Sequence, residues 1–299
     1  MPQFHNFFLT KPLADKFRQN VSGSKDGRPD WVESISIGGA GLFDEDSAVW
    51  QVHGCIATLV GGIRALLLQA AHPAPLAGVA QHSRYETDPM GRLAGTTRWL
   101  TITTFASKEV VEREALRVNE MHKRVSGEFQ NKSGAIETYR AQDSRFLLWV
   151  HCAFTNSFLK AHQALGYPIS QGADAYVREW ALSAIPLGLT SAPKSVSELE
   201  ACLEDFREKD LARVPATEQV VKFILKPPFG LGGLFFYRIL ANAAIATLDP
   251  NELQILGLKA RRKVWLKLAR ISLNIFIAIL GPESPSQMVA RQRLSKLAK

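Results

Sequence analysis

The stretch SKEVVEREALRVNEMHKRVSG, residues 107–127, decides the fold class because it predicts one long amphipathic helix. Ser107 is a favourable N-cap residue, and Gly127 is typical of the position just past a helix end. Between them, one face recurs at steps of four and three residues and is apolar except for a histidine. The members of this face are Val111, Ala115, Val118, His122 and Val125.

His122 is therefore predicted to point into the interior, where an imidazole needs a partner. Two interpretations follow from this helix alone. The first is a core histidine whose nitrogens are hydrogen-bonded. The second is a ligand to a metal or to haem iron. The other helices have to decide between them.

Composition places the chain among well-packed globular proteins. It has 299 residues, of which 46% are hydrophobic, so a sizeable core is available and wholesale disorder is excluded. The net charge is +8 and the sequence pI is about 9.5, which permits attraction to phosphates or to an anionic membrane surface. Much of this excess lies in the last forty residues.

Cysteine usage and the apolar segments favour a soluble, cytoplasmic protein. Cys55, Cys152 and Cys202 are widely spaced in the sequence and form no CxxC motif, so we expect neither a disulfide framework nor a zinc site. The N-terminus lacks the pattern of a signal peptide. Residues 47–63 and 271–280 are apolar, but they are too short or too polar for a membrane span.

The chain shows no sustained period-2 run, which predicts an all-α fold. We expect an irregular N-terminal arm over residues 1–45, a helical domain over 46–250 and a basic helical extension over 251–299 packed on the same domain. After residue 127, one helix is predicted to begin at Asp143, which serves as its N-cap. Further helices are predicted over residues 174–185, 195–211, 217–225, 235–248 and 251–280.

Two helices before residue 107 carry polar side chains of interest. The segment 56–71 has Arg64 as its only charge, and its Gly61-Gly62 pair permits close packing against a neighbour or a flat ligand. A helix starting at Pro89 places Arg92, Thr96, Trp99 and Thr103 on one face. This face indicates either the wall of a polar pocket or an exposed surface with one half-buried tryptophan.

A second histidine lies on a buried stripe of the helix after Asp143, because Leu147, His151, Phe154 and Phe158 recur at helical spacing. No zinc HExxH, GxSxG or phosphate-binding motif is present, and the basic C-terminal residues form no recognisable nucleic-acid module. Helices that each offer one polar side chain among apolar neighbours suit a large flat cofactor such as haem. The alternative is a well-packed helical protein without a cofactor.

Four ordered blocks resemble a known family. They are ALLLQAAHPAPLAGVAQHS (65–83), DPMGRL (88–93), MHKRVSG (121–127) and LLWVHCAFTNSF (147–158). Together they are similar to the bacterial branch of the MpaB/latex-clearing protein oxygenase superfamily, whose shared module is the rubber oxygenase catalytic domain. The resemblance covers roughly residues 35–250. It implies a single globin-like helical domain that binds haem b and uses O2 to cleave carbon–carbon double bonds of isoprenoid chains.

The resemblance also implies roles for individual residues. By order and approximate spacing, His122 corresponds to the histidine that binds the iron, and Arg92 and Thr96 correspond to a distal Arg-x-x-x-Thr element with a catalytic role. Gly95 stands where the latex-clearing proteins carry a lysine just before that threonine. His151 is the rival iron ligand.

Other cofactor contacts are expected from histidines and arginines near these blocks. His72 and His82 are pocket candidates, although His72 also suits a helix end where it satisfies backbone groups. Cations that pair with carboxylates are candidates for the haem propionates. These are Arg64, Arg84 and Arg117.

The function expected from the sequence is a haem b-dependent oxygenase acting with O2 on a small hydrophobic substrate of the isoprenoid type. Trp99, Leu100 and Phe105 are expected to line its apolar channel. Two alternatives stay open: a non-catalytic haem or lipid carrier or sensor, and a haem peroxidase-like oxidoreductase. No nucleic-acid partner is expected, and a peripheral membrane contact and the oligomeric state stay open.

Overall fold

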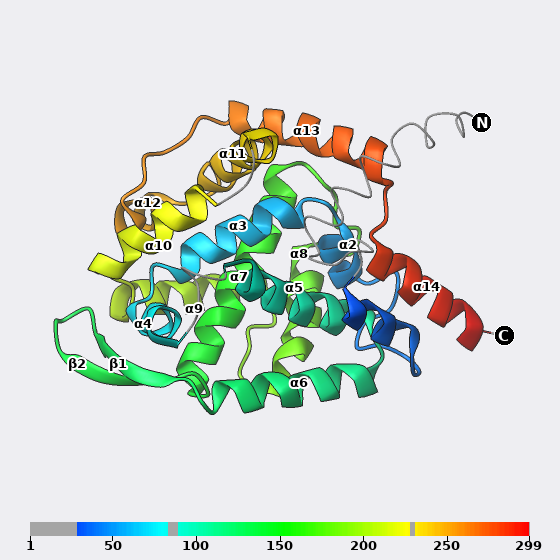
Figure 1. The fold of residues 1–299 in the computed structure, drawn as a ribbon, viewed down its shortest axis with the longest axis horizontal. Helices are drawn as coiled ribbons and strands as arrows, with labels where there is room; N and C mark the ends of the chain where they lie inside the picture. The colour runs from blue at the N-terminus through cyan, green and yellow to red at the C-terminus, as the bar shows by residue number, and fades with distance from the viewer. Residues whose placement is uncertain (1–28, 83–88, 228–230, 299) are drawn as a thin grey trace.

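The protein is built almost entirely of helices, as the sequence predicts. A computed structural model describes residues 29–82, 89–227 and 231–298, and in these the only sheet is a two-stranded hairpin (Figure 1). The elements in chain order are η1 Asp30–Ser36, α2 Ala48–Gly54, α3 Thr58–Gln69, α4 Pro73–His82, α5 Pro89–Phe105, α6 Lys108–His122, β1 Ser126–Gln130, β2 Ile136–Arg140, α7 Ser144–Ala164, α8 Ala173–Trp180, η2 Ala181–Leu187, α9 Val196–Lys209, α10 Pro215–Leu225, α11 Leu231–Ile245, α12 Pro250–Leu256, α13 Val264–Leu280 and α14 Pro285–Leu297.

The helix pair α3 and α7 forms the centre of the core, and α11 packs on another side of α3. Gly61 is what allows α3 to approach α7. A Cβ atom at Gly61 would lie 2.6 Å from a ring carbon of Phe158 and 3.1 Å from its Cα. Gly62, the next residue, has nothing within 4 Å of such an atom. The first glycine of the predicted Gly61-Gly62 pair therefore serves helix packing, and the second faces open space.

The sequence does not predict the hairpin, which shortens the helix expected over residues 107–127. The structure ends α6 at His122, and Gly127 lies in β1, paired with Tyr139 of β2. Asn131 forms the connecting turn, because its side-chain oxygen accepts hydrogen bonds from the backbone N–H groups of Ser133 and Ala135. Five-residue strands in a polar segment give a weak period-2 signal, which explains the error.

Most other helices begin and end within about four residues of the predicted ranges, although the range 174–185 comprises α8 and the 3-10 helix η2. Ser47 accepts a hydrogen bond from Trp50 N, while Ser107 and Asp143 occupy N-cap positions without a side-chain cap bond. The predicted helix 251–280 is two helices, α12 and α13, because Gly257 adopts a left-handed conformation (φ 66°) and ends the first. The final helix α14 packs on η1, where Arg293 Nη1 donates to the Ile35 carbonyl (2.7 Å).

No single helix in the described part of the chain is both long and apolar enough to cross a membrane. Two pairs of helices reach the length and apolar composition of a membrane span only when their members are added together, and each pair is bent at its connection. They are α2 with α3 and α13 with α14. The three cysteines are free thiols. The packing of α7 on α9 nevertheless brings the sulfur atoms of Cys152 and Cys202 to 3.5 Å, a proximity that their sequence spacing does not reveal.

Candidate functional site

Helices α5 and α6 are antiparallel neighbours joined by a buried carboxylate. Glu114 of α6 is 3% exposed and binds two arginines. Arg98 of α5 donates from Nε and Nη2 to Oε2 at 3.0 and 2.7 Å. Arg117 donates from Nε and Nη2 to Oε1 at 3.0 and 2.6 Å. In each pair two N–H groups of one guanidinium converge on a single carboxylate oxygen, so charge-assisted hydrogen bonds hold both oxygens of Glu114. The guanidinium of Arg117, expected at a haem propionate, is therefore paired within the protein.

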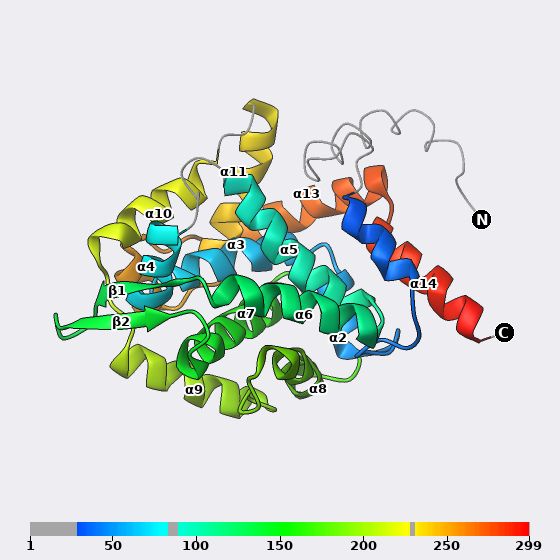
Figure 2. The same cartoon turned by 60° about the horizontal axis from the view of Figure 1, so that its bottom comes forward.

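This ion pair sets the register of the two helices. Arg92 lies six residues before Arg98, or about 9 Å along α5, and His122 lies eight residues after Glu114, or about 12 Å along α6. Because the helices are antiparallel, both displacements run toward the same end of the pair. Figures 1 and 2 show α5 and α6 close together at their connection and diverging toward that end. Arg92 and His122 thus lie toward the same end of the helix pair, the end away from its connection.

His122 is the last residue of α6 and is half-buried. Its Nδ1 atom is buried and has no hydrogen-bond partner in the described residues. Burial lowers the pKa of His122 below its ordinary value, so the imidazole is neutral at pH 7 and retains a lone pair for a ligand. No carbonyl or carboxylate among the residues that the structure describes is hydrogen-bonded to the His122 ring.

His151 lies on α7 and is 9% exposed. Its Nε2 atom is buried without a hydrogen-bond partner in the described parts of the chain. Burial lowers the pKa of His151 to about 4, which keeps this ring neutral as well. The two rival ligands lie on helices with different main neighbours: α6 packs against η2 and α5, whereas α7 packs mainly against α3.

His72 lies between α3 and α4 and is 1% exposed. Its Nδ1 accepts a hydrogen bond from Ala74 N (3.2 Å) at the start of α4, so the proton of the neutral ring is on Nε2. Rings of Phe146, Trp149 and Phe206 surround it, and burial lowers its pKa to about 4. This Nε2–H is buried without a hydrogen-bond partner in the described residues and, because it carries the proton, has no lone pair for iron.

His53 is the best-partnered imidazole in the described structure, although the sequence does not single it out. The Thr104 hydroxyl donates to the Leu100 carbonyl (2.7 Å), so its oxygen accepts from His53 Nδ1–H (2.9 Å). Nε2 then accepts from the Tyr176 hydroxyl (2.9 Å). Surrounding rings desolvate His53 and lower its pKa to about 3. No sequence signal marks this histidine, since its partners lie 51 and 123 residues away.

Arg64 is also held by the protein itself. It is 2% exposed, and its Nη2 atom lies 3.2 and 3.0 Å from the two carboxylate oxygens of Glu252 on α12. Its Nη1 donates to the Ser157 hydroxyl (2.9 Å). The geometry accounts for Arg64 as half of a buried ion pair between α3 and α12, and its expected role at a haem propionate finds no support here.

The predicted polar face of α5 is turned at least partly inward. Thr103 is fully buried with no partner for its hydroxyl in the described residues, and Thr96 and Trp99 are half-buried. A Cβ atom at Gly95 would have nothing within 4 Å, so the glycine found here leaves open space beside α5. Phe105 belongs to the core instead of a channel, because its ring packs edge-on against Trp50 at 4.9 Å.

Several predicted site residues lie wholly or partly outside the described structure. Arg84 falls in the segment 83–88, which the structure does not describe, and so does the expected cap Asp88. His82 and Arg92 lie on α4 and α5, but their side chains are not described. Their assigned roles stay predictions.

The described residues contain no group of three or more His, Cys, Asp or Glu side chains able to hold a metal ion. A site in which protein side chains supply every ligand is therefore not assembled in these parts of the chain. A neutral imidazole with an unpartnered nitrogen does suit a cofactor that brings its own metal and needs one axial ligand, as haem does.

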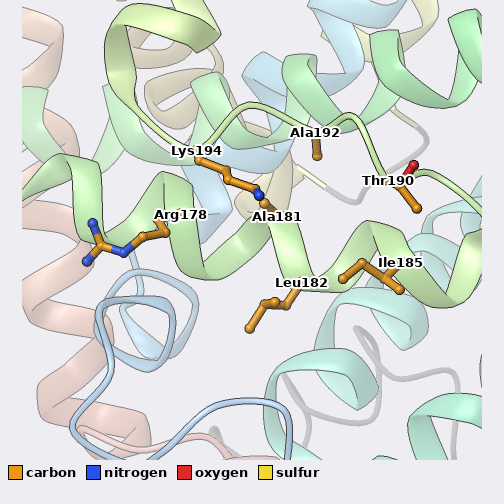
Figure 3. A pocket seen from close by; sticks show the side chains of 7 residues that line it. All are labelled: Arg178, Ala181, Leu182, Ile185, Thr190, Ala192 and Lys194. Atoms are coloured by element: carbon orange, nitrogen blue, oxygen red, sulfur yellow. The ribbon is translucent and has the colours of Figure 1, made fainter.

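One hollow on the surface is separate from these residues. It has a volume of about 310 Å³ and lies between η2 and the segment that follows it (Figure 3). Leu182 and Ile185 line its apolar side, the Lys194 side chain extends across it, and the Arg178 guanidinium points away from the other lining residues. None of the predicted haem or catalytic residues lines this hollow.

Comparison with known protein families gives one result. The family described as ER-bound oxygenase mpaB/B′ and rubber oxygenase, catalytic domain, matches residues 50–277. None of the curated proteins compared with the chain matches it. The matched range contains α3 to α7 with all the candidate ligands, and it spans most of the 299 residues. The chain therefore belongs to the mpaB and rubber oxygenase catalytic-domain family, which is a family of oxygenases.

Proposed function

We propose that this oxygenase-family protein is haem b-dependent and acts with O2 on a hydrophobic substrate of the isoprenoid type. The observation that carries the proposal is the half-buried, neutral His122 with an unpartnered nitrogen at the end of α6. A buried polar atom without a partner costs stability unless a ligand satisfies it. Haem supplies the iron at which O2 chemistry takes place.

His122 is the proposed iron ligand, and its lowered pKa favours the neutral form that binds a metal. Its position supports this role, because the register of α5 and α6 places it at the same end of the pair as Arg92. His151 is the rival, with a buried Nε2 in a similar state. Substituting each histidine in turn separates the two, because only the iron ligand should control the haem spectrum.

Thr96 and Arg92 would donate hydrogen bonds to the reacting groups if haem is bound. Support comes from the half-buried position of Thr96 on α5 and from the unpartnered hydroxyl of Thr103 on the same helix face. Donors aimed at developing negative charge in a water-poor site lower a reaction barrier. Arg98 and Arg117 are excluded from this role because Glu114 already pairs with both.

The test is product analysis under labelled oxygen. The full-length protein, reconstituted with haem, is incubated with squalene or a short polyisoprene under ¹⁸O2. We expect O2 uptake and carbonyl products that carry ¹⁸O, with Thr96→Val lowering the rate about tenfold or more. A Thr97→Val variant is the matched control, since Thr97 is an exposed neighbour on the same helix.

Three other outcomes contradict the proposal in different ways. Failure of the protein to bind haem after reconstitution contradicts the cofactor. Haem binding without O2 uptake on any alkene favours a carrier or sensor. Substrate oxidation without ¹⁸O in the product favours a peroxidase-like reaction.

A further inference from the structure

Helix α13 is apolar on the face that points away from the protein. Four large side chains recur on it at steps of four, three and four residues, which defines one stripe along the helix. We call this the α13 stripe; its members are Val264 (47% exposed), Leu268 (39%), Ile271 (58%) and Ile275 (54%). The opposite face carries Ala269 and Leu273, which are fully buried.

The fold explains only the inner face of this helix. α13 packs on α11, where the rings of Phe236 and Phe276 stack with their centroids 4.1 Å apart. Figure 1 shows α13 along the outer edge of the molecule, beyond α11. A surface helix normally places polar residues outward, so an apolar outer stripe indicates an environment other than water. Phe235 of α11, which is 70% exposed, adds apolar surface to the neighbouring helix.

Positive charge flanks the stripe. Residues 253–282 contain six lysines and arginines and no aspartate or glutamate. Arg261 donates to Asn242, and Arg270 donates to the Leu165 carbonyl, so these two are engaged within the protein. The other four are exposed, and the described residues offer them no ion-pair partner. They are Lys259, Arg262, Lys263 and Lys267.

We propose that the α13 stripe and its flanking cations dock the protein on the surface of an anionic phospholipid bilayer. The helix lies in the interface plane, with its isoleucines and leucine among the acyl chains and its cations at the headgroups. Its 17 residues span about 25 Å. A second copy of the chain is a poorer occupant, because residues 253–282 of the second copy bring the same cations and no carboxylates to pair with them.

The experiment is cosedimentation of the full-length protein with vesicles of phosphatidylcholine alone or of phosphatidylcholine with phosphatidylglycerol. We expect binding to the anionic vesicles, weakened by added salt, and little binding to the neutral ones. Ile271→Asp with Ile275→Asp is expected to weaken binding about tenfold or more. Arg262→Glu with Lys263→Glu is expected to weaken it roughly tenfold and to reduce its salt dependence.

Ile136→Asp is the matched control, since Ile136 on β2 is 66% exposed and lies outside the stripe. Circular dichroism and thermal unfolding of each variant check that the fold is retained. The proposal is overturned if the wild-type protein ignores anionic vesicles, or if the stripe variant binds them as the control does. It is also overturned by a third set of results, in which neither the wild-type protein nor any variant binds vesicles. In that set, the double variant Ile271→Asp with Ile275→Asp loses a dimer that the wild-type protein forms, or has a lower melting temperature. Those results would assign the stripe to a second copy or to residues 1–28 of the chain.

Discussion

Two sets of histidines in this molecule have opposite hydrogen-bonding states. Both nitrogens of His53 are bonded, one to Thr104 and one to Tyr176. His122 and His151 each bury a nitrogen that has no partner in the described residues, as do His72 and His162. In His72 and His162 the other ring nitrogen is bonded to the protein backbone, whereas neither nitrogen of His122 or His151 has a protein partner in the described residues. Burial lowers the pKa of His53, His122 and His151 alike. Burial alone therefore does not single out a candidate ligand; the bonding state of both ring nitrogens is the added criterion.

A similar contrast exists between tightly packed positions and positions beside open space. Arg64 and Glu252 form an ion pair in the core, and Gly61 is packed against Phe158, whereas Gly62 and Gly95 have no described atom within 4 Å of a Cβ position. Regions held by ion pairs and close packing are expected to respond to substitution through stability. Regions with unpartnered groups or open space are expected to respond through ligand binding.

The largest effect is expected from breaking the partnered cluster at Glu252. Glu252→Gln leaves the Arg64 guanidinium buried without a counter-charge, and we expect a loss of about 3–5 kcal/mol in the free energy of unfolding, measured in urea. The control is Glu200→Gln, which breaks the exposed Lys160–Glu200 pair and should leave stability unchanged. Similar stability for Glu252→Gln and the wild-type protein would show that the pair is not structural.

Gly61 and Gly62 provide a matched test of packed against open space. Gly61→Ala places a methyl group 2.6 Å from the Phe158 ring, so we expect a loss of about 2–3 kcal/mol. Gly62→Ala meets no atom and should raise the free energy of unfolding by about 0.5–1 kcal/mol through helix propensity. Chemical denaturation measures both. Equal effects of the two substitutions would be inconsistent with the described packing of α3 on α7.

Removing the partnered histidine should change stability and leave cofactor binding intact. His53→Phe retains a ring among Phe158, Tyr176 and Trp180 but leaves two hydroxyl groups without the imidazole. We expect a loss of about 1–2 kcal/mol in the free energy of unfolding. The haem absorption spectrum of this variant should match that of the wild-type protein. A lost or shifted haem band would place His53 in the cofactor site.

The acid dependence of stability should report the same histidine. The pKa of His53 falls from 6.5 to about 3 in the folded protein, so the unfolded chain binds a proton that the native chain does not. Above pH 6.5 neither the folded nor the unfolded chain binds this proton, so the free energy of unfolding does not change. As pH falls from about 6.5 toward 3, His53 lowers the free energy of unfolding by about 1.4 kcal/mol per pH unit. His53→Phe should have a correspondingly shallower slope in urea titrations between about pH 6 and pH 4. An unchanged slope would indicate that His53 is protonated in the folded state.

The sequence predicts the local features of the site well. Helical spacing correctly places Val111, Ala115 and Val118 on the buried face of α6, and the N-cap residues Ser107 and Asp143 lie where the sequence predicts. The family and the mostly helical fold are confirmed. These features depend on residues three or four positions apart, which a sequence displays directly.

Contacts between distant segments are what the sequence does not reveal. In the sequence Arg64 looks like an unpaired cation and so becomes a candidate for a haem propionate. Its partner in the fold, Glu252, lies 188 residues away, and the sequence does not reveal the pairing. The bonds of His53 and the early end of α6 at a short hairpin likewise depend on tertiary packing. Local patterns therefore identify candidate side chains, while their pairing within the fold decides which of them are free to bind a ligand.

The most direct test of this account compares the absorption spectra of three haem-reconstituted variants. We predict that His122→Ala loses or shifts the haem Soret band, while His53→Phe keeps the wild-type spectrum and His151→Ala keeps the iron-ligand signature. Loss of the band in His151→Ala with an unchanged His122→Ala spectrum would transfer the ligand to α7. A spectrum altered by His53→Phe alone would contradict the central claim that His122, and not the fully partnered His53, binds the cofactor.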